Sequence, residues 1–478
     1  MEAPDDIADR VAQVADLLEA IVADRGLLAP LDAELRKRLL MAAGRVSRPT
    51  GADRLRLKRA QRSKDRRVER EATRQLLSRT QIRKLRQNPI FLTPRRSEAG
   101  PLPEPIGNTP NERSCYCCRK KFREVHFFYD QMCVDCGDFN YRKRTPVADL
   151  SGRVALVTGA RVKIGFQAAV LLLRAGCRVI LTTRFPQDAA RRYAELEDFS
   201  EWSDRVEIVG IDLRQVPAVE GLCRDLLGRL DRLDFIINNA CQTVRRPPGF
   251  YDHLMEAERD TAALPAHCRA LLTSTTQRSL SSAELSQLAL LPEDTTSAAL
   301  FPAGALDADQ QQVDLRRVNS WRLDLAEVPT LELLEVQLVN AVAPFILNAR
   351  LKPLMERVQT ADKHIVNVSA MEGQFYRIFK SSRHPHTNMA KAALNMLTRT
   401  AALDYIDSGI HMNSVDTGWV TDEDPVHHAA RKREEQGFHP PLDIVDGAAR
   451  IVDPIFSGLS TGKHVWGQFL KDYVPTDW

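Results

Sequence analysis

From residue 154 onward, short apolar runs that are typical of strands alternate with amphipathic runs that are typical of helices. The strand-like runs read VALV at 154–157, RVILTT at 178–183, VEIVGID at 206–212 and LDFIINNA at 233–240. Strands separated by helix-length segments pair in parallel, because each crossover returns the chain to the same end of the sheet. The expected fold class is therefore α/β, a doubly wound parallel sheet with helices on both faces.

The first of these runs leads into the turn TGARVKIG, residues 158–165, and then into a helical run. Gly159 and Gly165 bracket the turn. Glycines at these places let the backbone approach a pyrophosphate at a helix N-terminus, as in Rossmann-type folds. Because the turn follows a strand and opens a helix, the sequence predicts a dinucleotide site there.

Further landmarks follow in order. They are Asp212-Leu213, NNAC at 238–241, Asn340, IVNVSAMEG at 365–373, Lys391 in MAKAAL and NSVDTGWVT at 413–421. Together with the glycine turn, they resemble the short-chain dehydrogenase/reductase family over roughly residues 150–478. The resemblance implies a Rossmann-type oxidoreductase in which Asn340 has a structural and proton-relay role. It also implies the cofactor-binding residues Thr158, Gly159, Arg161, Lys163, Ile164, Gly165, Arg184, Asp212, Leu213, Asn239, Ala240 and Lys391.

The end of the second strand indicates which cofactor to expect. The chain there reads TTRF, with Arg184 where an acid would bind the ribose hydroxyls of NAD(H). Arginine favours the additional 2′-phosphate, and Arg161 and Lys163 add positive charge beside it. We therefore expect NADP(H). Lys163 also replaces the middle glycine of the turn, so the phosphate contact there must differ from the family pattern.

The catalytic positions of the family are only partly kept. Ala370 occupies the place of the serine, and Thr387, four residues before Lys391, occupies that of the tyrosine. A lysine cannot ionise a threonine hydroxyl near neutral pH as it can a phenol with a pKa of about 10. Candidates for a replacement proton donor are His384, His386 and Tyr376. Lys391 is expected to bind the nicotinamide ribose, and the YxxxK pattern at 376–380 is interpreted as a decoy.

An insertion enlarges the dehydrogenase-like region. One hundred residues separate Asn239 from Asn340, and the excess lies at about 250–324. It is rich in Ser, Thr and Ala, which predicts partial disorder. Insertions at the carboxyl edge of a parallel sheet lie over the ligand crevice, so we expect a lid or a partner-binding arm. Arg245 and Arg246 either face an anionic group there or belong to a solvated loop.

Five of the nine cysteines lie within residues 113–145. Cys115 with Cys118 and Cys133 with Cys136 give two CxxC pairs, spaced by fourteen residues. Two such pairs complete a closed tetrahedral zinc site, which leaves no position for a catalytic water. Cys117 is an alternative ligand in place of a neighbour. Gly137 is expected in the tight turn of the second pair. The sequence thus predicts a structural zinc-binding module.

The first 97 residues are predicted to be helical. Ile7, Val11, Val14, Leu18 and Ile21 form a seam with coiled-coil-like spacing, and Asp32 is placed to cap a second short helix. This hairpin packs either on its own protein, on a second copy or on a different protein. A proline-rich linker is expected at 98–112.

Residues 53–96 hold 16 basic and four acidic residues, a surplus of 12, whereas the whole chain carries only +4 and the remainder therefore −8. The block from 55 to 88 contains no Gly or Pro and is predicted to be one helix. Its charge suits nucleic-acid phosphates or an acidic protein partner. The alternative is a solvated helix whose arginines meet the acidic remainder of the same chain.

Composition excludes several classes. The chain has 44% hydrophobic and 27% charged residues, no membrane-length apolar run and too few cysteines for a disulfide scaffold. We expect a cytoplasmic homo-oligomer without a membrane partner. Two functions are consistent with the sequence. One is an NADP(H)-dependent oxidoreductase with an altered proton donor, acting on a carbonyl or enoyl substrate. The other is an inactive dinucleotide-binding scaffold or sensor that binds a protein or nucleic-acid partner through its zinc module and basic helix.

Overall fold

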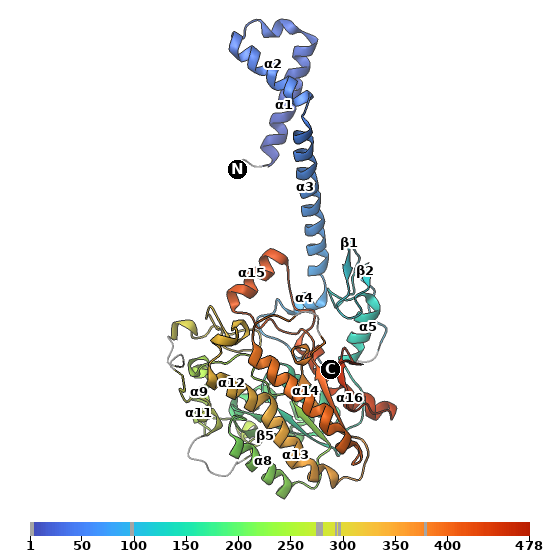
Figure 1. The fold of residues 1–478 in the computed structure, drawn as a ribbon, viewed down its shortest axis with the longest axis vertical. Coiled ribbons are helices and arrows are strands. Elements are labelled where there is room, and N and C mark those ends of the chain that lie inside the picture. Colours follow the sequence, from blue (N-terminus) through green and yellow to red (C-terminus); the bar gives the residue numbers. More distant parts are fainter. Residues whose placement is uncertain (1–3, 96–99, 274–280, 292–293, 295–297, 377–379) are drawn as a thin grey trace. The chain divides into compact units, whose positions relative to one another are not determined.

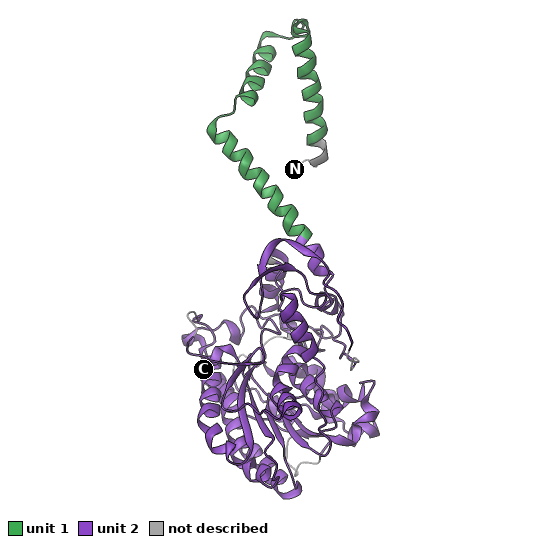
Figure 2. Cartoon of the chain, turned by 90° about the vertical axis from the view of Figure 1, so that its right-hand side faces the viewer, with its two compact units in different colours: residues 1–72 green, residues 73–478 purple. Residues whose placement is uncertain are grey.

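The computed structural model describes residues 1–478 apart from 1–3, 96–99, 274–280, 292–293, 295–297 and 377–379. The chain divides into two compact units, Met1–Ala72 and Thr73–Trp478 (Figure 2). Parts of the proline-rich segment and of the insertion expected to be disordered lie outside the described residues.

The first unit is helical, as predicted. It contains α1 (Pro4–Ala23), a 3₁₀ turn η1 (Arg25–Leu28), α2 (Ala33–Ser47) and most of α3 (Gly51–Ser78). Asp32 caps α2 as expected, because its carboxylate accepts the N–H groups of Glu34 at 3.0 Å and Leu35 at 2.9 Å. Ile7, Val11 and Val14 of the predicted seam are 54–63% exposed, whereas Ile21 is buried.

The second unit is built on a central sheet with helices packed around it (Figure 1). The sheet has eight strands in the order β10-β9-β8-β7-β6-β3-β4-β5. Its strands are β3 (Val154–Thr158), β4 (Arg178–Thr183), β5 (Val206–Gly210), β6 (Phe235–Asn238), β7 (Lys363–Ser369), β8 (Ile410–Asp416), β9 (Phe469–Lys471) and β10 (Val474–Thr476). All pairings are parallel except β9 with β10. The strand order reverses direction between β3 and β6, and ligands bind at such switch points in open α/β sheets.

Helices cover both faces of the sheet, which confirms the α/β Rossmann-type prediction. One apolar core joins it to α6 (Lys163–Arg174), α7 (Pro186–Ala194) and α16 (Ile444–Thr461). A second core joins it to α8 (Val216–Arg229), α13 (Ala343–Glu356) and α14 (Pro385–Ile406). Between β8 and α16 lies α15 (Val426–Gln436).

A small module precedes the sheet. It consists of the antiparallel pair β1 (Asn108–Ser114) and β2 (Lys121–Glu124), followed by α5 (Val134–Lys143). The predicted linker at 98–112 therefore ends early, since β1 starts inside it. Phe127, Phe128 and Tyr129 are buried in one cluster with Leu442 and Ile444, so the module shares a core with the sheet domain.

The prediction of one continuous helix at 55–88 is wrong. The helix ends at Ser78, and α4 (Gln81–Leu85) starts after Thr80. The N–H groups of Gln81 and Ile82 donate to the carbonyls of Phe127 and Phe128 at 3.0 and 3.1 Å. Ile82 is fully buried among the module residues. These tertiary contacts outweigh the local helix propensity.

Within the described chain, one helical run, Thr330–Glu356, is long and apolar enough to cross a membrane by length and composition. It comprises α12 (Thr330–Gln337), a π-helical turn η9 (Leu338–Val342) and α13. Leu347, Leu351 and Leu354 of this run are fully buried against α8 and the sheet. Core helices pass the same test, so the run is weak evidence for a membrane span.

Candidate dinucleotide site and cysteine centre

The glycine turn lies at the carboxyl end of β3 and packs closely on the end of β6. A Cβ on Gly159, whose φ is 65°, would lie 2.8 Å from the Cα of Ala240, and one on Gly165 would lie 2.2 Å from Asn239 Nδ2. Asn239 Nδ2 donates to the carbonyls of Thr158 and Gly159 at 3.0 and 3.1 Å. Ala240 N donates to Thr158 Oγ1 at 3.0 Å. The structure thus brings together these five predicted cofactor-binding residues.

Helix α6 begins in this turn with N–H groups that no side chain caps. Val162 is the N-cap residue and provides no side-chain hydrogen bond. Free N–H donors at a helix N-terminus favour a phosphate. The side chain of Ile164 packs toward α16, since a Cβ on Gly447 would lie 3.0 Å from Ile164 Cδ1. Ile164 can therefore meet a cofactor through its backbone.

Lys163 occupies the middle-glycine position with a φ of 55°, a left-handed conformation that glycine adopts without strain. Its charge faces two carboxylates. Burial raises the pKa of Asp309, an insertion residue, and the nearby Lys163 opposes that rise. Lys163 and Thr421 hold the pKa of Glu423 below its usual value despite burial. Lys163 of the glycine turn thus has two carboxyl groups near it, Asp309 from the insertion and Glu423 from the segment after β8.

The insertion also engages the cations at the end of β4. Arg184 Nη2 donates to the hydroxyl of Tyr251 at 2.6 Å, and its guanidinium lies 4.8 Å from the centre of the Tyr251 ring. Burial alone would raise the pKa of Tyr251, but Arg184 and Arg161 lower it. Arg161 forms an ion pair with Asp188 at 2.5 Å.

Glu258 of α9 (Asp252–Arg259) was not found from the sequence. Its carboxylate accepts the N–H groups of Asp188 at 2.8 Å and Gln187 at 3.2 Å, which caps the N-terminus of α7. Burial raises the pKa of Glu258 to about 7. No sequence signal could reveal this cap, because Glu258 lies about 70 residues beyond the helix it serves.

Asp212 and Leu213 follow β5. The Asp212 carboxylate accepts hydrogen bonds from Nη2 of Arg214 at 2.7 Å and from its Nε at 3.0 and 3.1 Å, so an adenine contact would share it with Arg214. Arg214 also pairs with Glu335 at 2.7 Å. Leu213 is buried in the core beneath α8, so its backbone rather than its side chain is available to a ligand.

The structure answers the question about Arg245 and Arg246 left open by the sequence. Arg245 is 8% exposed and binds both carboxylate oxygens of Asp294, at 2.5 and 2.8 Å, and Glu335 at 3.0 Å. Arg246 forms an ion pair with Asp314. Both arginines therefore form ion pairs with carboxylates of the insertion, Asp294 and Asp314, and do not belong to a solvated loop.

Asn340 and Lys391 are both buried near the carboxyl ends of β6 and β7. Asn340 lies in the π-helical turn η9, where its Oδ1 accepts the N–H of Gln242 at 2.7 Å and its Nδ2 donates to the Gln242 carbonyl at 3.2 Å. Lys391 Nζ donates to the Val368 carbonyl at 2.8 Å. An ammonium has three donors, so Lys391 can also bind a ribose hydroxyl.

Neither Ala370 nor Thr387 provides an acidic group. Ala370 follows β7, and the adjacent Ser369 points away toward α14, where its Oγ donates to Asn395 Oδ1 at 2.6 Å. The hydroxyl of Thr387 is buried, and no hydrogen-bond partner for it occurs among the described residues.

The three candidate proton donors do not lie together at one place in the structure. His384 is the N-cap residue of α14, with a φ of 44°, and stacks on Trp321, with ring centres 3.9 Å apart. Burial lowers the pKa of His384. His386 is buried and contacts Glu332 of α12 through Nε2 at 3.2 Å. Tyr376 is 49% exposed.

The four cysteines of the predicted metal site converge. The sulfurs of Cys115, Cys118, Cys133 and Cys136 all lie within 4.8 Å of one another. Cys115 and Cys118 come from the β1–β2 turn, Cys133 caps α5 and Cys136 lies in its first turn. Cys117 instead contacts Met132 Sδ at 4.0 Å.

Gly137 lies inside α5 and not in a tight turn, so that expectation is wrong. A Cβ there would lie 2.6 Å from the ring of His126. The ring is fixed because His126 Nδ1 accepts the N–H groups of Phe128 at 3.0 Å and Tyr129 at 3.1 Å. Close packing, rather than a turn, explains the glycine.

Buried polar contacts join the module to α16 and to the loop after β8. Arg144 binds both oxygens of Asp443 at 2.8 and 2.9 Å, and Tyr129 donates to Asp446 at 2.5 Å. Trp419 N donates to the hydroxyl of Tyr116 at 3.0 Å. The cysteine module is thus held by hydrogen bonds and ion pairs against α16 and against the loop that follows β8.

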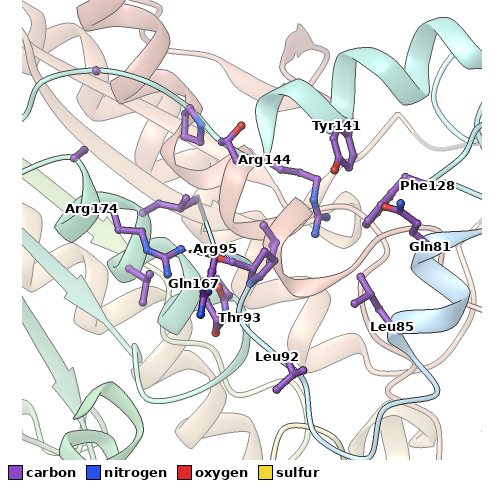
Figure 3. Close-up of a pocket in the computed structure, with 18 residues that line it drawn as sticks. Gln81, Leu85, Leu92, Thr93, Arg95, Phe128, Tyr141, Arg144, Gln167 and Arg174 are labelled. Atoms are coloured by element: carbon purple, nitrogen blue, oxygen red, sulfur yellow. Dashed lines mark hydrogen bonds between the residues drawn. The ribbon is translucent and has the colours of Figure 1, made fainter. Parts of the chain in front are cut away.

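A cavity of about 320 Å³ lies between the module and α6 (Figure 3). Its lining includes Phe128, Tyr141 and Arg144 from the module region and Gln167 and Arg174 from α6. Gln167 and Arg174 come from the middle and the end of α6, so the cavity is separate from the glycine turn at the start of this helix.

A Rossmann-type sheet with a glycine turn at its switch point is the architecture on which many α/β proteins bind dinucleotides. Comparisons with known proteins give its family. The short chain dehydrogenase model matches residues 153–260, and the model described as Enoyl-(Acyl carrier protein) reductase matches residues 318–437. The gap between the two matches falls within the predicted insertion.

Among curated relatives, the Uncharacterized protein R665 of Acanthamoeba polyphaga mimivirus is 31% identical over 377 residues, which cover 75% of this chain and 74% of that protein. A Fatty acyl-CoA reductase of Acinetobacter baylyi is 32% identical over 98 residues, 20% of this chain and 32% of the relative. The solved Pseudomonas aeruginosa RhlG/NADP active-site complex is 19% identical, with a TM-score of 0.44 over 70% of this chain and 97% of that one. The chain belongs to the short-chain dehydrogenase/reductase family.

Proposed function

We propose that the protein is an NADP(H)-dependent oxidoreductase with a non-standard catalytic site. The observation that carries the proposal is the N-terminus of α6, which has no side-chain cap and follows a glycine turn at the switch point of the sheet. The glycines Gly159 and Gly165 let this turn pack closely on Ala240 and Asn239. When bound, the dinucleotide supplies or accepts a hydride. Lys391 would hold the nicotinamide ribose, and Asn340 would keep the Gln242 backbone in place beside it.

Arg184 supports the preference for a 2′-phosphate. Its guanidinium lies at the carboxyl end of β4 and donates to the Tyr251 hydroxyl, and no ion pair with a carboxylate is found for it among the described residues. A 2′-phosphate would therefore gain a full charge pair with Arg184.

The test compares NADPH and NADH binding by calorimetry. Arg184→Gln should weaken NADPH binding by about 10- to 150-fold and leave NADH binding nearly unchanged, since a charge-assisted phosphate contact contributes about 1.5–3 kcal/mol. Arg178→Gln, at the opposite end of β4 and 48% exposed, is the matched control. Equal loss for both cofactors would contradict the 2′-phosphate assignment, and no binding of either would contradict the proposed function.

A second function is favoured by the loss of the acid at Ala370 and Thr387. In this alternative, the chain binds the dinucleotide without turnover and acts as a scaffold or sensor. Tight NADPH binding without oxidation across a panel of carbonyl and enoyl substrates would support the alternative. Oxidation that Lys391→Ala abolishes would support the enzyme.

We also propose that the four cysteines bind one structural zinc ion. Four thiolates within 4.8 Å match the closed S₄ sets that zinc prefers. Metal analysis of the purified chain should give about one zinc per chain. Cys118→Ser, which removes an exposed ligand, should abolish binding, whereas Cys117→Ser should keep it. Full zinc content in the Cys118 variant would refute the assignment.

A further inference from the structure

Helix α3 carries a face composed mainly of arginine. Arg56, Arg59, Arg62, Arg66, Arg67 and Arg70 are all exposed. At about 100° per residue, these six side chains fall within an arc of about 140° around the helix. The acids of the same stretch, Asp53, Asp65, Glu69 and Glu71, all fall outside this arc. Five of the arginines and Ser63 line one hollow of the surface. We call the six residues the arginine face.

The charge of this face is not neutralised within the part of the first unit that the structure describes, where none of its six members takes part in an ion pair. The helix does not need them for packing, because residues 51–68 are exposed all round. An exposed row of like charges costs stability through repulsion and suits a polyanionic partner.

We infer that the arginine face binds the phosphate backbone of a double-stranded nucleic acid. Eight of the ten basic residues of α3 are arginine, whose planar guanidinium binds phosphate in a bidentate manner. A membrane-bound helix needs a broad apolar face and a protein interface needs an apolar centre. Between residues 55 and 72, the arc contains a single large apolar side chain, Leu55, at its N-terminal end.

The dimensions match the backbone of a duplex. Arg56 and Arg70 are fourteen residues apart, which is about 21 Å at 1.5 Å per residue. One strand of a duplex presents a phosphate about every 3.4 Å, so about six phosphates face this length. Contacts of this kind read charge and not base sequence, and binding should therefore be independent of sequence.

The test uses the full-length protein and a fluorescently labelled 20-base-pair DNA duplex, with binding followed by anisotropy between 50 and 200 mM NaCl. The triple variant R59Q/R62Q/R66Q removes three charges from the arginine face. The matched control R54Q/K58Q/K64Q removes three charges from the rest of the same helix. Glutamine is a good helix former, so circular dichroism should show the same helicity in both variants.

We expect the triple variant to bind at least about 10-fold more weakly at 100 mM NaCl, and its plot of log K against log salt to be less steep by about 2 to 3. The control should remain close to the unmodified protein. The inference is overturned if the duplex does not bind at 50 mM NaCl or if both variants lose affinity equally. It is also overturned if anionic phospholipid vesicles or polyglutamate bind as tightly as the duplex.

Discussion

Three histidines meet at the end of the sheet opposite the glycine turn, near the amino ends of β7 and β8. His364 is the second residue of β7, His411 is the second residue of β8, and His464 follows α16. His364 Nε2 lies 3.0 Å from His464 Nδ1, and the rings of His411 and His464 stack with centres 4.5 Å apart. Burial lowers the pKa of all three, and for His364 and His411 the neighbouring histidines lower it further. The folded state thus favours three neutral imidazoles.

This cluster predicts a loss of stability in mild acid. The folded-state pKa values lie below the unfolded value of about 6.5, so the unfolded chain takes up protons first as the pH falls. The stability is complete above about pH 6.5 and decreases below it. Urea unfolding should show a fall in the free energy of unfolding of about 1–3 kcal/mol between pH 7.5 and 5.

Other buried histidines contribute to the same pH dependence, so a variant isolates the cluster. His464→Gln should reduce the difference between pH 7.5 and pH 5, whereas His267→Gln, on the surface of the insertion, should not. An unchanged difference in the His464 variant would show that the cluster does not titrate on unfolding.

At the residue scale, the sequence predicted sites whose residues are recognised by their spacing along the chain. The cysteine quartet is of this kind. The resemblance to the family named Thr158, Gly159, Gly165, Asn239 and Ala240 as cofactor-binding residues; the structure brings them together, and their binding of a cofactor stays a prediction. The sequence did not predict the Tyr251 partner of Arg184 or the Glu258 cap of α7, because both depend on how the insertion folds back.

At the scale of elements, the strands of the dehydrogenase region were predictable from alternation, whereas ends set by tertiary contacts were not. The end of α3 at Ser78 is an example. The local sequence favours a continued helix, but the helix is interrupted there because Ile82 is buried in the core of the module. The π-helical turn at Asn340 is another, because the sequence around it has the apolar character of an ordinary helix.

Helix α5 offers a test of the close contact between Gly137 and His126. Gly137→Ala should destabilise the module by about 1–3 kcal/mol, because the added methyl group overlaps a ring held by two backbone hydrogen bonds. Gly228→Ala in α8, where no atom lies within 4 Å of an added Cβ, is the control and should be neutral or stabilising. Thermal unfolding monitored by Trp fluorescence and zinc release measures both. Equal melting temperatures in the two variants would contradict the contact.

At the scale of the molecule, the insertion is part of the fold and not merely a cover. Leu264, Cys268 and Leu271 are buried in the main core with α6 and α7, and Thr273 N donates to the Ile208 carbonyl of β5 at 3.0 Å. The sequence indicated a lid or an arm because insertions at the carboxyl edge of a parallel sheet lie over the ligand crevice. The Ser/Thr/Ala-rich composition of this segment predicted partial disorder and gave no sign of a core contact. The few apolar residues that anchor it are spaced too irregularly to form a pattern.

This position predicts the effect of core variants in the insertion. Leu271→Ala should lower the free energy of unfolding of the sheet domain by about 2–5 kcal/mol, because it leaves a cavity in the main core. Leu288→Ala, also in the insertion but 47% exposed, should change it by less than about 0.5 kcal/mol. Denaturant unfolding of both variants is the measurement. A Leu271 variant as stable as the control would mean that the insertion detaches independently.

The docking of the cysteine module on α16 has a consequence for synthesis of the chain. Arg144 and Tyr129 find their partners Asp443 and Asp446 about 300 residues later. At about 5–20 residues per second, a ribosome needs roughly 15–60 s to reach them. During that interval, the aromatic face of the module has no α16 to cover it. A metal ion captured early would hold the module in shape until the last helix emerges, so zinc supply during translation should limit the yield of folded protein.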